Sequence, residues 1–203
     1  MLGHMLLRAV AVVLAALLAG SALTGCDDED QPEEPTPSAV STPLTDFATD
    51  DITVARADFC SRVAPNAVEE ALGAAVESAE TYANGDRVEV APGVRDVAHE
   101  YGCTWTAADG TVARAWVFAP PVTAEQADGL VTSAPGKGCR QVRSAPAYGD
   151  PSVAALCGDE LAFHGLFGDA WLSCSVEATG TDHQALLDRA GRWCVTVAQA
   201  AAA

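Results

Sequence analysis

Two tight-turn signals do most to limit what this chain can fold into. Asp109-Gly110 and Gly168-Asp169 each lie between two stretches in which apolar side chains recur at alternate positions. A glycine-containing pair in that setting is typical of a β-hairpin with a two-residue turn. The sequence therefore predicts antiparallel hairpins over residues 101–118 and 160–178.

The turn at Asp109-Gly110 predicts the pairing across the first hairpin. Because side chains alternate along a strand, a two-residue turn places three cross-strand pairs on one face, which we expect to be buried. These pairs are Trp105 with Arg114, Cys103 with Trp116, and Tyr101 with Phe118. Arg114 beside Trp105 could hold an anion, but we favour an arginine at the rim of the core whose guanidinium stacks on the indole.

The second hairpin has one apolar face and one mixed face. The apolar face pairs Phe163 with Cys174 and Leu161 with Val176, and we expect it to be core. The mixed face carries four residues that we take as a candidate ligand-binding surface: His164, Leu166, Trp171 and Ser173. Trp171 combines a large contact area with a polar N–H, as many interface anchors do. The alternative is that the last helix of the chain covers this face.

Three segments have the pattern of amphipathic helices. The first is Pro65–Leu72, which begins with a proline and is followed by a glycine. The second covers residues 123–134, and the third begins near residue 181. Each of these two opens with a Thr-x-x-Gln capping box, at 123–126 and at 181–184.

Short strands are expected at residues 87–90 and 153–157, between turn signals. Helices that alternate with hairpin-joined strands are typical of the α+β class. The sequence therefore predicts an α+β fold in which an antiparallel sheet built from hairpins packs against about three helices.

The cysteines predict that this fold is disulfide-stapled. Apart from Cys26, the chain has an even number of cysteines, which in an exported protein indicates disulfides. Several connectivities are possible, and we favour the sequential one: Cys60–Cys103, Cys139–Cys157 and Cys174–Cys194. The middle pair would close a short polar loop, which stabilises a domain by about 3 kcal/mol in the chain-entropy model.

The chain is expected to have three parts. Residues 1–25 read as a signal peptide, because one arginine precedes an apolar run that is shorter than the roughly 20 residues of a spanning helix. Residues 26–54 are acidic and rich in proline, so they bury too little apolar surface to fold and are predicted to form a disordered tether. Residues 55–203 are predicted to form a single α+β domain.

The end of the apolar segment, Leu23-Thr24-Gly25-Cys26, resembles the lipobox of bacterial lipoproteins. In that family the cysteine receives a diacylglyceryl group and becomes the new N-terminus. Two acyl chains hold a protein stably on a membrane, whereas one holds it marginally. The resemblance implies a lipid anchor on Cys26 and a position on the extracytoplasmic face of the cell membrane. An ordinary signal peptide with a chance cysteine is the alternative.

The charge of the chain excludes one class of partner. The formal net charge is −17, from 28 acidic and 11 basic residues. Nucleic-acid binding needs a basic patch, so we expect no nucleic-acid partner. An acidic surface instead suits a soluble domain that is held away from anionic lipid headgroups.

No motif in the chain predicts catalysis, a metal site or a cofactor. Beyond the apolar segment the histidines are His99, His164 and His183, and neither a GxSxG elbow nor an HExxH motif accompanies them. We therefore expect a protein that is not an enzyme. Two alternatives stay open: a secreted hydrolase, in which a histidine meets Ser, Asp or Glu in a cleft, and a structural or accessory envelope lipoprotein without a ligand.

Several features together resemble the actinobacterial cell-envelope lipoproteins of unknown function. They are the lipobox, the acidic tether, an Ala-Leu-Gly helix end after Cys60, the motif Cys103-x-Trp105, and Gly-Leu-Phe-Gly-Asp-Ala-Trp at 165–171. That group is loosely similar to the extracellular sensor domains of actinobacterial receptor kinases. The resemblance implies an exported, lipid-anchored and disulfide-bonded domain. We therefore expect a binding or sensor-like domain that captures a small envelope molecule or a partner protein.

Overall fold

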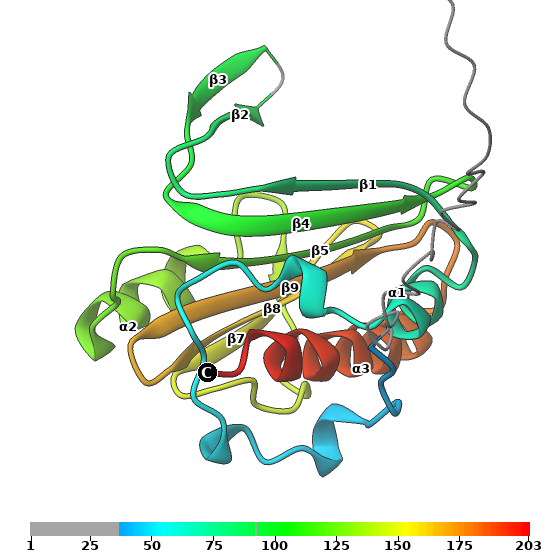
Figure 1. Cartoon of the computed structure of the whole chain (residues 1–203). Coiled ribbons are helices and arrows are strands. Elements are labelled where there is room, and N and C mark those ends of the chain that lie inside the picture. Colours follow the sequence, from blue (N-terminus) through cyan, green and yellow to red (C-terminus); the bar gives the residue numbers. More distant parts are fainter. Residues whose placement is uncertain (1–36, 92) are drawn as a thin grey trace, which may run out of the picture. The chain divides into compact units, whose positions relative to one another are not determined.

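The domain is built on one antiparallel sheet of seven strands (Figure 1). The computed structural model describes residues 37–91 and 93–203. The strands lie in the order β1-β4-β5-β9-β8-β7-β6, and β2 and β3 form a separate hairpin, the arm, which projects beyond β1 (Figure 1). The strands are β1 (Val76–Tyr82), β2 (Arg87–Ala91), β3 (Val94–Val97), β4 (Glu100–Ala107), β5 (Val112–Phe118), β6 (Arg140–Gln141), β7 (Ser152–Cys157), β8 (Glu160–Phe167) and β9 (Ala170–Glu177). The α-helices are α1 (Pro65–Leu72), α2 (Ala124–Ser133) and α3 (His183–Ala201). This arrangement confirms the predicted α+β class.

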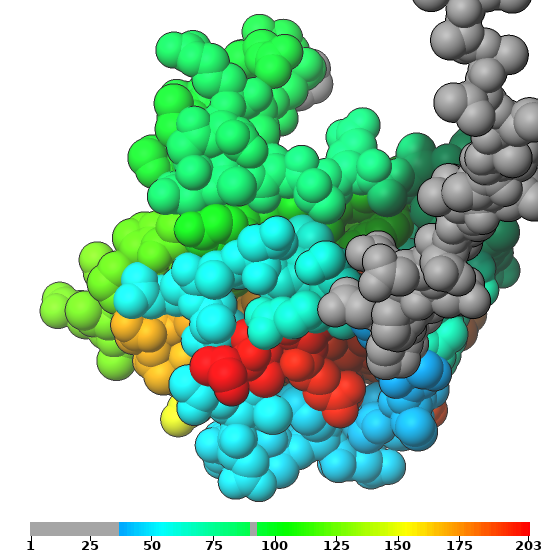
Figure 2. Space-filling view, in the orientation of Figure 1, coloured from blue at the N-terminus to red at the C-terminus, as the bar shows by residue number. Residues whose placement is uncertain are grey.

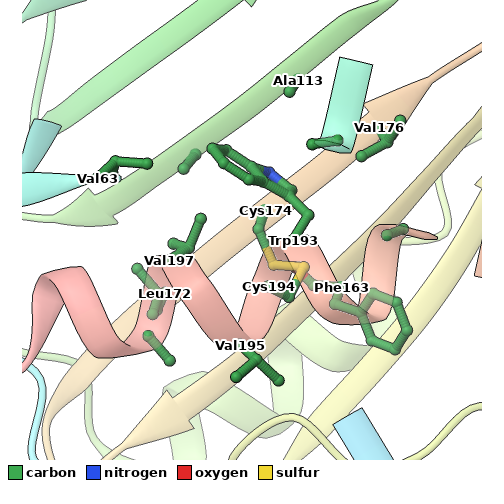
Figure 3. Packing of buried hydrophobic residues seen from close by; sticks show 14 of the residues in the cluster. Val63, Ala113, Phe163, Leu172, Cys174, Val176, Trp193, Cys194, Val195 and Val197 are labelled. Atoms are coloured by element: carbon green, nitrogen blue, oxygen red, sulfur yellow. A yellow bond between two sulfur atoms is a disulfide. The ribbon is translucent and has the colours of Figure 1, made fainter. Parts of the chain in front are cut away.

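Helices α1 and α3 pack on one face of the sheet, the inner face, and the main core lies between them and the strands. Trp193 of α3 lies at the centre of this core (Figure 3). Its ring meets that of Trp105 edge to face, with centroids 5.3 Å apart. Its Nε1 donates a hydrogen bond of 3.0 Å to the main-chain oxygen of Arg114. The apolar stripe of α3, which repeats about every 3.6 residues, thus packs against alternate residues of the strands, which all point to the inner face.

The first hairpin has a different register from the predicted one. Trp105 lies opposite Ala113 and Cys103 opposite Ala115, one residue away from the pairing that a two-residue turn would give. The loop contains three residues, because Gly110 takes a positive φ of 86° and the N–H of Ala107 donates to the oxygen of Thr111. A type I turn followed by a glycine in the left-handed region gives this longer loop.

The one-residue change moves half of the predicted core to the other face of the sheet. Cys103 and Trp105 do point into the core, as predicted. Arg114, Trp116 and Phe118 point to the opposite face, and alanines and a valine of β5 fill the core in their place. The predicted stacking of Arg114 on Trp105 is therefore wrong.

The second hairpin and the first two helices confirm the predictions. Phe163 lies opposite Cys174 and Leu161 opposite Val176. Helix α1 has the predicted bounds, and Thr123 caps α2 with the predicted capping box. Helix α3 differs at its start: Asp182 rather than Thr181 is the N-cap, and its carboxylate accepts from the N–H groups of two residues in the first turn.

The six cysteines of the domain pair in the favoured sequential order. The disulfides are Cys60–Cys103, Cys139–Cys157 and Cys174–Cys194. The first joins the segment before α1 to β4, and the third joins β9 to α3 within the core (Figure 3). These two bridges hold both inner-face helices to the sheet.

The predicted tether includes a part that lies against the domain. Leu44 and Val54 are buried, and Leu44 contacts α3 where Gly191 leaves room for it. The side-chain amide of Asn66 in α1 exchanges two hydrogen bonds with the main chain of Ala39. Isolated apolar residues within a polar stretch give no periodic signal, which is why composition alone assigned residues 37–54 to the tether.

Candidate ligand-binding site

The face of the sheet opposite α1 and α3, the outer face, carries a row across three strands, the aromatic row, in which a glycine lies between two aromatic residues. Tyr82 of β1 lies opposite Gly102 of β4, and Gly102 lies opposite Trp116 of β5. A Cβ atom on Gly102 would be 2.3 Å from Cζ of Tyr82, so the tyrosine ring occupies the space that the glycine leaves. Tyr82 therefore covers Gly102, and Trp116 lies directly opposite Gly102 on the next strand.

Tyr82 is held in this position by a hydrogen bond as well as by packing. Its hydroxyl donates to Oε1 of Glu100 over 2.7 Å. Burial, and then this bond to a carboxylate, raise the pKa of Tyr82 well above its ordinary value. The hydroxyl is therefore a fixed donor to Glu100 at neutral pH.

A second row of the outer face is polar. Glu80 lies opposite Thr104, Thr104 opposite Arg114, and Arg114 opposite Ser175. The guanidinium of Arg114 lies 3.2 Å from Glu160 and 3.0 Å from Glu177, two carboxylates at the ends of β8 and β9. The polar row thus runs parallel to the aromatic row, and the two rows are two residues apart along each strand.

A cleft of about 560 Å³ lies between these two rows and the arm. Figure 2 shows the arm standing apart from the body of the domain. The floor of the cleft includes Tyr82, Thr104 and Trp116, and the arm supplies its wall. Its charged lining residues are three glutamates and three arginines: Glu80, Glu89, Glu100, Arg87, Arg95 and Arg114. Its volume is in the range of about 300–1,000 Å³ that is typical of small-molecule sites.

The four residues predicted as a ligand-binding surface lie together, but the structure buries most of them. Leu166 and Trp171 form a small core with Val122 and with Ala127 of α2. Ser173 is fully buried, and Trp171 is only 3% exposed. Helix α2, and not the last helix, covers this end of the outer face, while α3 covers the inner face. The exposed surface that we predicted from these residues is therefore closed.

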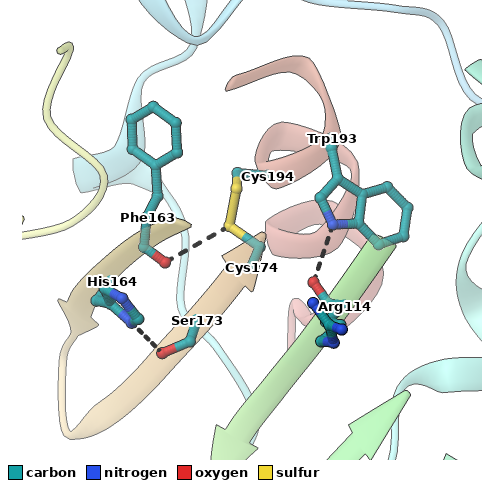
Figure 4. The surroundings of a disulfide bond; sticks show 7 residues. All are labelled: Arg114, Phe163, His164, Ser173, Cys174, Trp193 and Cys194. Atoms are coloured by element: carbon teal, nitrogen blue, oxygen red, sulfur yellow. Dashed lines mark hydrogen bonds between the residues drawn. A yellow bond between two sulfur atoms is a disulfide. The ribbon is translucent and has the colours of Figure 1, made fainter. Parts of the chain in front are cut away.

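His164 and Ser173 nevertheless form a close pair. Nδ1 of His164 lies 2.9 Å from Oγ of Ser173 (Figure 4). The imidazole stacks parallel to Trp171, with ring centroids 6.4 Å apart, and burial lowers the pKa of His164 to about 4. Because Ser173 is fully buried and neither residue lines the cleft, this contact gives no support to a hydrolase in which histidine activates an accessible serine.

Of the other sequence-predicted positions, Arg114 and Cys103 line the cleft. Cys26 is outside the described residues. His99 and His183 are exposed on separate parts of the domain. Within residues 37–91 and 93–203, no three His, Cys, Asp or Glu side chains group as metal ligands, and no helix is long and apolar enough to cross a membrane.

Sequence reasoning missed the residues that form the cleft. Trp116 was assigned to the core, because the register of the first hairpin was one residue off. Tyr82 and Glu80 lie in β1, which no clear alternation marks because both of its faces are largely exposed. The signal that could have found them is Gly102: a glycine inside a strand often marks a place where another group approaches closely.

No protein-family model matches the chain, and no curated protein is significantly similar to it in sequence.

Proposed function

We propose that this chain is the binding domain of an exported lipoprotein, and that it captures a small envelope molecule or a partner protein in the cleft between the arm and the outer face. Its action is noncovalent. The observation that carries the proposal is the row of Tyr82, Gly102 and Trp116 beneath the arm. Gly102 leaves the space that the ring of Tyr82 occupies. This arrangement exposes two aromatic residues to the cleft and contributes nothing to the main core.

The cleft has the composition of a site that orients a ligand. Its floor belongs to a sheet that is fixed on the inner face by two disulfides, so it is preformed. A rigid floor lowers the entropy cost of binding. The arm is a separate two-stranded hairpin, and hairpins of this size are only marginally stable alone. Ligand contacts with Arg87 or Arg95 of the arm would add to its stability.

A fragment screen tests this role of the cleft. The ¹⁵N-labelled domain would be mixed with a chemically diverse set of small polar molecules, and amide shifts would be mapped onto the structure. We expect the shifts to cluster on β1, β4, β5 and the arm, and to weaken in Trp116→Ala. Shifts that cluster elsewhere, or no shifts with any molecule, would count against the proposal.

Anchoring through Cys26 is the second part of the proposal, and the lipobox-like sequence Leu23-Thr24-Gly25-Cys26 supports it. We expect Cys26→Ser to release the protein from the membrane fraction into the medium, because Cys26 is the residue to which a lipobox assigns the acyl chains. Fractionation of cells that express each form measures this. A Cys26→Ser protein that stays in the membrane fraction would contradict the anchor, and leave the binding role of the cleft to its own test.

A further inference from the structure

We infer that the cleft binds an uncharged carbohydrate, with a sugar ring seated on Tyr82 and Trp116 and its hydroxyl groups on the polar row and the arm. The inference rests on the proposed binding function of the cleft and gives that function a class of ligand. Three features of the cleft lead to it: the two aromatic residues of its floor, the mixture of donors and acceptors around them, and the balance of its charges.

The floor matches the flat face of a sugar ring. A pyranose ring presents C–H groups on its faces and hydroxyl groups around its edge. Aromatic rings offer a rigid apolar surface with a partial negative charge on each face, which suits such C–H groups. The ring of Tyr82 lies over Gly102 and is fixed by Glu100, so it is already in place before a ligand arrives. Trp116 lies opposite Gly102 on the next strand and also lines the cleft.

The edge of the floor matches the hydroxyl groups of a sugar. A hydroxyl both donates and accepts hydrogen bonds, so it needs acceptors and donors within reach. Glu80 and Thr104 stand on the polar row beside the aromatic floor, and Arg87 lies across from them on the arm. Among the described residues, no ion pair engages Glu80 or Arg87. An acceptor and a donor are thus available on opposite sides of the cleft.

The charges of the cleft disfavour an ionic ligand. Its three glutamates and three arginines balance, although the whole chain has a net charge of −17. An anion would meet the glutamates of the floor and the negative field of the domain. A cation would meet Arg87 and Arg95 of the arm, since Arg114 is already paired with Glu160 and Glu177. Either kind of ion is therefore opposed within the site. An uncharged polar molecule can use both kinds of group. With a volume of about 560 Å³, the cleft has room for a short oligosaccharide.

Fluorescence of Trp116 gives a direct test. Of the four tryptophans, Trp105, Trp171 and Trp193 are buried, whereas Trp116 lines the cleft. Quenching by acrylamide therefore reports mainly on Trp116. We would add cellotriose, maltotriose or chitotriose, and in parallel inorganic phosphate and trilysine. We expect at least one trisaccharide to protect Trp116 with a Kd below about 1 mM, and phosphate and trilysine to have no effect.

Variants separate the sugar site from general effects. Titration calorimetry with the protecting trisaccharide should show a Kd raised about ten-fold or more in Tyr82→Ala and in Glu80→Gln. Glu125→Gln and Arg143→Gln change exposed residues outside the cleft and should leave the Kd unchanged. Arg87→Gln should weaken binding of the trisaccharide. Arg143→Gln is its matched control, because it makes the same change outside the cleft.

Two results would overturn the inference. One is that no trisaccharide protects Trp116, and the other is that phosphate or trilysine protects it instead. If fragments of other chemistry still shift amides of the cleft, the proposed binding function stands and only the sugar is wrong. If neither sugars nor fragments reach the cleft, both proposals fail.

Discussion

His164 on β8 and Ser173 on β9 face each other across the outer face, with Nδ1 and Oγ 2.9 Å apart. The imidazole lies between two indoles: it stacks on Trp171 and meets Trp116 at a steep angle. Trp116 also lines the cleft. His164 and Ser173 therefore lie beside Trp116 on the same face of the sheet and contact the side of the residue that we assign to ligand binding. The histidine is neutral there, because burial lowers the pKa of His164 to about 4.

This burial predicts a loss of stability in mild acid. The ordinary pKa of histidine is about 6.5, so an unfolded chain binds a proton at pH values where folded His164 does not. The free energy of unfolding should therefore be unaffected by His164 above about pH 6.5 and should fall as the pH decreases towards 4. A shift of this size corresponds to at most roughly 3 kcal/mol.

Urea unfolding between pH 4 and pH 7.5 measures the effect. Carboxylates also titrate in this range, so the quantity of interest is the difference between the wild type and His164→Gln, which cannot gain the proton. We expect that difference to change with pH between 4 and 6.5. His99→Gln, a change at an exposed histidine, is the matched control for the substitution itself. Parallel curves for the wild type and His164→Gln would contradict a buried neutral imidazole.

Gly102 predicts a second measurable coupling. Its replacement by alanine puts a methyl group where Cζ of Tyr82 lies, so the ring must leave the floor and lose its bond to Glu100. We expect Gly102→Ala to lower the free energy of unfolding by about 1–3 kcal/mol. In a Tyr82→Ala background the same change should cost far less, because the space is then empty. Denaturant unfolding of the four proteins of this double-mutant cycle isolates the interaction.

An equal cost of Gly102→Ala in both backgrounds would show that Tyr82 does not use the space above Gly102. Tyr82→Phe is the matched control for the hydroxyl. It keeps the ring and removes the bond to Glu100, and should cost only about 1 kcal/mol.

We expect the removal of two disulfides to lower the stability of the domain by unequal amounts, although they close loops of similar length. Cys174–Cys194 spans 20 residues and Cys139–Cys157 spans 18, so the chain-entropy model gives each about 3 kcal/mol. Cys174 and Cys194 are fully buried in the core, however, whereas the other two cysteines are partly exposed. Paired alanine replacements should therefore destabilise the domain more at Cys174 and Cys194. Equal losses in thermal or urea unfolding would mean that packing around this bridge adds nothing.

The sequence predicts the elements of this fold better than it predicts which faces of the strands are buried. The second hairpin has the predicted register, because Gly168 and Asp169 form a two-residue turn. In the first hairpin, Asp109-Gly110 looks equivalent, but Ala108 joins the loop and the register moves by one. The two outcomes differ by one residue in a turn, and local sequence carries little information about which is adopted. Yet the change decides whether Trp116 lies in the core or in the cleft.

The candidate site could not be predicted for a further reason. The cleft combines β1, β4 and β5 with the arm, and the sequence did not indicate that β1 would pair with β4. The mixed face of the second hairpin was predicted correctly as a face. Its exposure depended on where α2 would pack, which is a tertiary property. Periodicity within a segment says which residues share a face, but not what covers them.

Replacement of two glycines by alanine should change the free energy of unfolding in opposite directions. Gly165 of β8 lies against the backbone of the segment before β7: a Cβ atom there would be only 1.5 Å from the oxygen of Tyr148. Backbone cannot move aside as a flexible side chain can, so we expect Gly165→Ala to cost about 3 kcal/mol or more. Gly129 lies inside α2 and a Cβ atom there would meet no atom within 4 Å. Gly129→Ala should therefore stabilise the domain by about 0.5–1 kcal/mol, because alanine favours helix.

Chemical unfolding and the yield of folded protein distinguish these cases. Gly168→Ala should have an intermediate stability. Its Cβ would also meet no atom within 4 Å, but its φ of 66° lies in the left-handed region. Strain alone should then cost about 1–2 kcal/mol. The expected order of stability is Gly129→Ala above the wild type, then Gly168→Ala, then Gly165→Ala. A Gly165→Ala protein as stable as Gly168→Ala would mean that Tyr148 does not lie against β8, since strain in the turn would then cost as much as a clash with the backbone.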